Sequence, residues 1–257
     1  MGSSMPSILH NKAIVLAVES QDRSRAAYPL PDYDIVRDVF FVLTHDAVCV
    51  HRAIGRLVDS GWSAPGGALL RTLMDISVSA VAVNRAASPK LAAFRYLYSG
   101  LRRHSRDVGL PAKARRAMFQ QIRQRLALLA PADRTLAAAV VKDRDRPYWF
   151  APEWKGPSEV IELYSDPEMK WVYLQASAAA HATFLGARLF RDDPDKMDIN
   201  PRDVGPRAVS LELASCRWLA EIVRVRNTSE QLGLEEQIDG LVSEIREAVA
   251  RIPRAAT

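Results

Sequence analysis

Two nearly charge-free segments with helical periodicity constrain the fold of this chain most. The first, Ala64–Asn84, holds only Arg71 and Asp75 as charges, and the second, Trp171–Ala187, holds only His181. Helices this apolar pack inside a protein, where an ionisable group costs several kcal/mol unless it is paired or hydrogen-bonded. These polar positions therefore mark a candidate site, without saying what the site does.

The pattern along the whole chain predicts an all-α fold, a single helical-bundle domain of about nine or ten helices. Apolar residues recur at intervals of three and four, and most Pro and Gly residues lie between the periodic runs. The predicted helices are Ile8–Ala27, Asp32–Ser60, Pro65–Ala86, Pro89–Val108, Pro111–Leu129, Ala132–Val141, Ser158–Leu163, Glu168–Arg191, Pro206–Leu232 and Leu234–Ile252.

Residue types at the ends of these runs support several boundaries. Asp32, Ser88 and Ser158 are typical N-cap residues, and Gly61 and Gly233 are typical of helix C-termini. We expect residues 1–30 to form an N-terminal helix, 31–191 the helical core, and 192–257 a connector followed by a peripheral C-terminal helical hairpin.

Two features along the chain leave alternatives open. The irregular stretch Asp143–Pro157 carries four aromatic residues, which either plug the end of the core or line the mouth of a pocket. The amphipathic final helix either packs against the preceding helix or forms the seam of a homodimer. The four aromatic residues are Tyr148, Trp149, Phe150 and Trp154.

Composition places the chain among ordinary globular proteins, and we expect it to be cytoplasmic. It has 257 residues, 48% hydrophobic and 25% charged, with no N-terminal apolar run long enough for a signal sequence. The long apolar segments are interrupted by polar residues, so no membrane span is expected. Cys49 and Cys216 are far apart, which disfavours a disulfide in this compartment.

The sequence offers no spacing typical of a metal or cofactor site, so we expect neither. There is no Cys-x-x-Cys pair and no Glu-x-x-His pair, and glycine motifs for phosphate or dinucleotide binding are absent. His45 and His51 are six residues apart on one predicted helix and therefore point in different directions.

Basic residues are concentrated between Arg102 and Arg125, where eight Lys or Arg side chains stand against one Asp. Such a segment either gathers the phosphates of a nucleic acid or only solvates the outer face of a helix pair. No helix-turn-helix, RNA-binding sheet or zinc-finger pattern accompanies it. The candidate nucleic-acid-binding residues are Arg102, Arg103, Lys113, Arg116 and Arg123.

The polar residues of the two apolar helices are arranged at helical spacing. Arg71 and Asp75 are four apart and share a helix face, which suits an ion pair. Tyr173, Ser177 and His181 follow one another in steps of four and form a single polar stripe. A histidine beside hydroxyl groups is suited to general acid or base chemistry, although a hydrogen-bonded core histidine is the ordinary alternative.

Four stretches of this sequence together resemble a widespread bacterial family known only as a domain of unknown function, over most of residues 61–189. That resemblance implies an all-helical fold with a polar centre built from Arg71, Asp75 and His181, and it brings no established activity. The stretches are Ala68–Asp75, Phe94–Tyr98, Trp154–Glu159 and the stripe Tyr173, Ser177 and His181.

The chain departs from that family at two positions. Asp75 stands where the family has Glu, and Ala182 and Thr183 follow the histidine where the family has Ser or Gly. A distant similarity to helical ribonucleases of the HEPN kind, which use Arg and His in a helical groove, is weaker. Their Arg lies a few residues before the His, and no basic residue stands at that spacing before His181.

Two functions follow, and the residues leave open whether the protein is an enzyme. In the first, the protein is a toxin or defence-type protein directed at RNA or a phosphate ligand. His181 is then the acid or base, Arg71 and Asp75 complete the catalytic set, and Tyr173 and Ser177 support it. In the second, the same residues only fix the helical core, and any function is one of binding or structure at the surface.

Overall fold

The computed structural model is all-helical and describes residues 5–28, 34–107, 109, 111–127, 131, 134–135, 154–164, 167–180 and 205–252. These residues form nine helices and no strands, packed as one helical bundle, which confirms the predicted fold class. The helices are α1 (Met5–Ala27), α2 (Ile35–Asp59), α3 (Ser63–Arg85), α4 (Pro89–Asp107), α5 (Ala112–Leu126), α7 (Pro157–Ile161), α8 (Pro167–Ala180), α10 (Pro206–Glu230) and α11 (Glu235–Ala250).

The helix ends follow local chemistry, with two corrections to the predicted caps. Asp34, not Asp32, is the N-cap of α2, and its side chain accepts a 2.8 Å hydrogen bond from the Val36 amide. α7 begins at Pro157 after Gly156, so Ser158 lies inside the helix and is not its cap. Pro suits this first position because its nitrogen has no hydrogen to leave unpaired.

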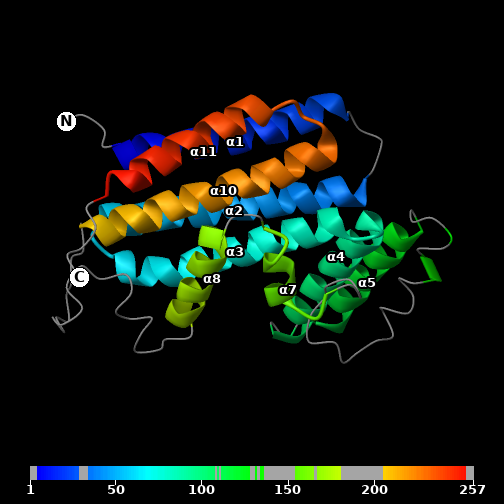
Figure 1. Ribbon diagram of the computed structural model, residues 1–257. Helices are drawn as coiled ribbons and strands as arrows, with labels where there is room; N and C mark the ends of the chain where they lie inside the picture. Colours follow the sequence, from blue (N-terminus) through cyan, green and yellow to red (C-terminus); the bar gives the residue numbers. More distant parts are fainter. Residues whose placement is uncertain are drawn as a thin grey trace.

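The helices form layers, which Figure 1 shows from the side. α1 and α11 lie together at the top, α10 and α2 lie beneath them, and α3 packs below that pair. α4, α7 and α8 pack against α3 on its far side, and α5 packs against α4. α3 is therefore the element that joins the long upper bundle to the shorter helices.

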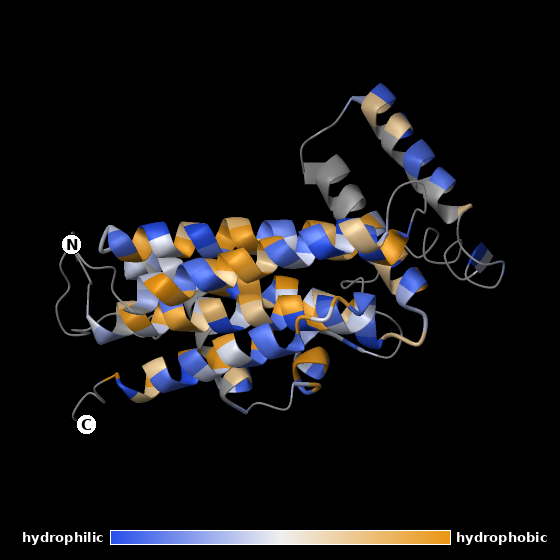
Figure 2. Ribbon diagram, turned by 90° about the horizontal axis from the view of Figure 1, so that it is seen from above, coloured by the Kyte–Doolittle hydropathy of each residue, from blue (hydrophilic) through white to orange (hydrophobic). Residues whose placement is uncertain are grey.

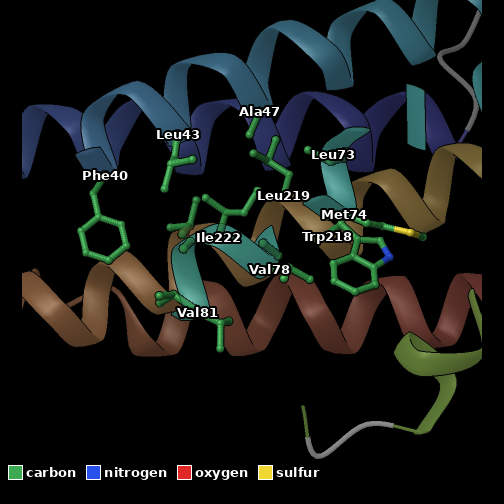
Figure 3. Close-up of a cluster of buried hydrophobic side chains, with 14 of the residues drawn as sticks. Phe40, Leu43, Ala47, Leu73, Met74, Val78, Val81, Trp218, Leu219 and Ile222 are labelled. Carbon is green, nitrogen blue, oxygen red and sulfur yellow. The ribbon is translucent and has the colours of Figure 1, made fainter. Parts of the chain in front are cut away.

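α10 is a central helix of the bundle, whereas we expected the C-terminal hairpin to be peripheral. It packs against α1, α2, α3 and α11, and its Trp218, Leu219 and Ile222 are almost completely buried. Figure 3 shows these side chains meeting Leu43 of α2 and Leu73 of α3 in one apolar cluster. The amphipathic pattern could not reveal this position, because it reports that a face is buried and not how many neighbours surround it.

The amphipathic α11 packs within the chain. Its buried residues lie against α10 and α1, which is the first of the two arrangements that the sequence left open. Val249 is 37% exposed at the end of that face. The buried residues of α11 are Ile238, Leu241, Val242, Ile245 and Ala248.

Within the described residues, the stretch Pro65–Arg85 of α3 is long and apolar enough to cross a membrane. Its most apolar window is 67% buried inside the bundle, as expected for a core helix. Cytoplasmic location stays a prediction.

Several predicted elements lie outside the described residues. They include nearly all of the predicted helix Ala132–Val141, most of the connector that follows residue 192, and Tyr148, Trp149 and Phe150 of the aromatic stretch. Trp154 is described, and it is partly buried against the hydrophobic core.

Candidate functional site

Arg71 and Asp75 form the expected ion pair on α3, at the rim of the bundle and not in its middle. Arg71 Nε lies 3.0 Å from Asp75 Oδ1, and Arg71 Nη2 lies 2.9 Å from the same oxygen. The Arg71 side chain is 18% exposed, whereas that of Asp75 is 50% exposed. Asp75 therefore keeps much of its hydration, and the pair carries little of the desolvation cost of a fully buried one.

The structure brings Tyr173 and Ser177 of α8 to this same arginine. Arg71 Nη2 donates to the Tyr173 hydroxyl and Nη1 donates to Ser177 Oγ. The guanidinium also lies over the Tyr173 ring, 3.9 Å from the ring centroid. Four of the five residues predicted to share a site are thus together, and we call them the Arg71 cluster.

The hydrogen bonds of the Arg71 cluster occupy most of its donors. A guanidinium has five N–H groups, and here they serve Asp75, the Tyr173 hydroxyl and Ser177 Oγ. The Ser177 hydroxyl in turn donates to the Tyr173 carbonyl at 2.8 Å. The arrangement holds α3 against α8 and leaves Arg71 little capacity for a substrate anion.

His181, the predicted acid or base, lies outside the described residues, immediately after the last described residue of α8. Its place relative to Arg71 and Asp75 stays a prediction. The side chains of Arg102, Arg103 and Arg123 are also outside the described set. Of the predicted nucleic-acid-binding residues, Lys113 and Arg116 are described, and both are exposed on α5.

A second polar cluster, which the sequence analysis missed, lies where α1, α2 and α10 meet. The His10 and His51 rings are stacked, with centroids 3.9 Å apart and planes 19° apart. Ligand atoms of His10, His51 and Cys216 all lie within 4.8 Å of one another. Glu212 Oε1 lies 3.6 Å from His10 Nδ1, and Ser215 Oγ lies 2.9 Å from His51 Nδ1. We call these five residues the His10/His51 cluster.

Burial favours the uncharged forms of these groups. It lowers the pKa of His51 to about 3, helped by His10 and Arg52, and it lowers the pKa of His10 as well. Burial also raises the pKa of the Glu212 carboxyl to about 7, and it raises the pKa of the Cys216 thiol strongly. At neutral pH both imidazoles are neutral and the thiol keeps its proton.

The hydrogen bonds of the His10/His51 cluster do not satisfy all of its polar atoms. His51 Nε2 lies 3.3 Å from the His10 carbonyl oxygen, which only accepts, so Nε2 carries the proton of the neutral ring. His51 Nδ1 must then accept. The one proton of Ser215 Oγ serves either this nitrogen or the Glu212 carbonyl, which is 2.7 Å away. His10 Nδ1 is buried and makes no hydrogen bond.

The sequence contained one usable signal for this cluster. Glu212 and Cys216 are four residues apart on one helix, so they share a face of α10. Gly55, one turn after His51, is the residue that admits the His10 ring, because a Cβ there would lie 2.5 Å from His10 Cε1. The side chains of this cluster come from three helices, so no regular spacing in the sequence relates them. The spacing between His45 and His51 gives no information about His10 or Cys216.

Comparison with known proteins adds no assignment for this chain. No protein-family model, no curated protein and no solved structure matches it. The established description is therefore that of a helical protein with a buried polar cluster of His, Ser and Cys side chains.

Proposed function

We propose that this protein binds RNA through the basic segment Arg102–Arg125, and that the Arg71 cluster is a structural clamp and not a catalytic centre. The observation that carries the proposal is α5, which has five Lys or Arg side chains and no acidic residue. Figure 2 shows α5 extending away from the main bundle, where an extended polyanion can reach it.

The charge of this region is not neutralised within α5 itself. Lys113 and Arg116 are exposed, and they are separated by one helical turn on the same side. Each phosphate that such a residue neutralises releases a condensed counterion, which favours binding at low salt. The chain as a whole has a formal net charge of only +5, so the attraction is concentrated on this segment.

The geometry of Arg71 supports the structural part of the proposal. Its guanidinium contacts Asp75, Tyr173 and Ser177 at once, and a catalytic arginine needs donors directed at the position where charge develops. Arg71→Ala is therefore expected to loosen α8 from α3. It should leave the affinity for RNA unchanged.

The test is fluorescence anisotropy of a labelled single-stranded RNA oligonucleotide, titrated with the full chain at several salt concentrations. Each phosphate contact contributes about 0.7 to the slope of log K against log salt for a single strand. Lys113→Gln/Arg116→Gln should thus lower the slope by about 1.4 and weaken binding by about 25-fold at about 0.1 M salt.

The matched control is Arg56→Gln/Arg85→Gln, which removes the same charge from exposed positions on α2 and α3. It should leave the salt slope unchanged. Equal losses in both double variants would show only nonspecific attraction to a basic chain. Failure to bind RNA, or tighter binding to vesicles of anionic lipid, would refute RNA as the partner. Cleavage of the RNA by the wild type that is lost in a folded Arg71→Ala variant would refute the structural role of Arg71.

A further inference from the structure

We propose that the His10/His51 cluster is a zinc site, with His10, His51 and Cys216 as ligands and Glu212 completing a tetrahedral set. Neither the sequence spacing nor any comparison indicates this site, and it is independent of RNA binding. Two imidazoles with one thiolate and one carboxylate form a donor set that suits Zn²⁺, which accepts nitrogen, sulfur and oxygen ligands.

The ligand atoms lie somewhat farther apart than in a zinc-bound site, so the cluster must contract. Zinc lies about 2.0–2.3 Å from its ligands, so ligand atoms in a tetrahedron are about 3.3–3.8 Å apart. The ligand atoms of His10, His51 and Cys216 are within 4.8 Å of one another, and His10 Nδ1 lies 3.6 Å from Glu212 Oε1. The His10 and His51 rings are stacked, so their in-plane lone pairs lie in nearly parallel planes, and the partly exposed His10 ring must also turn before both nitrogens can bind one ion.

The one buried polar atom of the cluster without a hydrogen bond is one that a metal would use. His10 Nδ1 is buried without a hydrogen bond, which costs free energy in the metal-free protein and disappears when the lone pair binds a cation. The Nε2–H of His51 is held by the His10 carbonyl, which turns the lone pair of Nδ1 toward the cluster. Histidine ligands of metals commonly have this second hydrogen bond to a carbonyl group.

The charges balance when zinc is bound. One thiolate and one carboxylate offset the two charges of Zn²⁺, and the protons that these groups still carry are released to solvent on binding. A neutral complex avoids the cost of an unpaired charge at a place where the His51 and Cys216 side chains have no exposure at all. The His10 side chain is 13% exposed, and it marks the side from which the ion enters.

The experiment is titration of the demetallated full chain with Zn²⁺ against a chromogenic chelator, and with Co²⁺ as a spectroscopic probe. We expect one ion per chain. Tetrahedral d–d bands in the visible and a thiolate-to-cobalt charge-transfer band in the near ultraviolet should accompany the cobalt form. Cys216→Ser should abolish the charge-transfer band, and His10→Gln should weaken zinc binding at least about 100-fold, more than loss of an outer-shell partner does.

The chain offers a matched control in its other Cys and His pair. Cys49 is exposed, and its Sγ lies 3.9 Å from His45 Nε2 on the surface of α2. Cys49→Ser should leave zinc binding and the cobalt spectrum unchanged. Circular dichroism checks the fold of each variant, and His10→Gln, at the partly exposed ligand, keeps the test valid if Cys216→Ser unfolds.

Three results would overturn the zinc site. The first is failure of the wild type to bind zinc or cobalt. The second is a cobalt spectrum without thiolate and tetrahedral bands. The third is loss of binding in Cys49→Ser together with retention in His10→Gln, which would place the ion on the surface of α2.

Discussion

The buried ion pair between Arg226 and Glu230 of α10 gives the sharpest test of how this bundle is stabilised. Their side chains are 1% and 6% exposed, and Arg226 Nε lies 3.0 Å from Glu230 Oε1. The pair makes one good contact only, because Arg226 Nη1 and Glu230 Oε2 are buried without partners. Burial lowers the pKa of Arg226, and the nearby Arg25 and Arg37 lower it further, while Glu230 raises it.

We predict that Glu230→Ala destabilises the protein by about 3–5 kcal/mol, because it leaves a buried guanidinium facing two other arginines. In contrast, Arg226→Met/Glu230→Met should lie within about 1 kcal/mol of the wild type or exceed it, because both desolvation costs disappear together. For a chain of this size the single variant corresponds to a melting temperature lower by roughly 10 °C.

Urea unfolding of the wild type, Glu230→Ala, Arg226→Met, Glu230→Met and the double variant measures these free energies. The wild type and the three Met variants form a double-mutant cycle. The control is Asp239→Ala, which removes one of the two carboxylate partners of Arg224, from an exposed pair at 2.8 Å, and should cost less than about 1 kcal/mol. If the double variant is as unstable as Glu230→Ala, the pair contributes net stability, and the reasoning from unsatisfied atoms is refuted.

Three further predictions concern α10 and its neighbours. The pKa of Glu212 is raised to about 7, so the folded protein holds a proton between pH 4.5 and 7 that the unfolded chain has lost, and stability falls as pH rises through this range. We therefore expect the free energy of unfolding of Glu212→Gln relative to that of the wild type, measured with urea in EDTA, to be about 2 kcal/mol higher at about pH 8 than at about pH 5, allowing for solvent screening. An equal difference at both pH values would contradict a buried carboxyl. Gly55→Ala should cost about 1–3 kcal/mol by thermal unfolding, because the new Cβ would lie 2.5 Å from His10 Cε1, and an unchanged melting temperature would mean that the ring moves away freely. Gln231→Gly should stabilise by about 0.5–1 kcal/mol in the same assay, because Gln231 has φ 54° at the C-cap of α10, and a loss would show that its side chain outweighs this strain.

The helices of the described residues could be predicted from the sequence because helix formation depends on local signals. The apolar period and the positive φ at Gly61 act within a few residues, although the N-cap of α2 is Asp34 and not the predicted Asp32. The Arg71 cluster was predictable for the same reason. Arg71 and Asp75 are one turn apart on α3, and Tyr173 and Ser177 are one turn apart on α8. Their meeting needed only two apolar helices that each carry two polar residues one turn apart.

The His10/His51 cluster could not be predicted in this way, because it depends on how three helices are rotated about their axes. His10 belongs to α1, His51 to α2 and Cys216 to α10, and no spacing in the chain relates them. The rotation of a helix about its axis is set by the packing of side chains along its whole interface, and not by one residue. Gly55 belongs to this arrangement because it leaves room for the His10 ring, but its role can be recognised only once the position of His10 is known.

The central position of α10 explains why its polar residues form clusters with partners from other helices. A surface helix turns its polar residues to water, but α10 is covered by α1, α2, α3 and α11. Its buried polar side chains must therefore obtain hydrogen bonds or ions from neighbouring helices, or remain unsatisfied at a cost. Asn227 obtains them from the start of α11, through the Leu234 amide and Glu235. Arg226 and Glu230 obtain them only in part. Glu212 and Cys216 lie beside His10 and His51, and together these side chains offer the donor types that zinc prefers. The same burial thus accounts for the weak ion pair at one end of α10 and for the proposed metal site at the other.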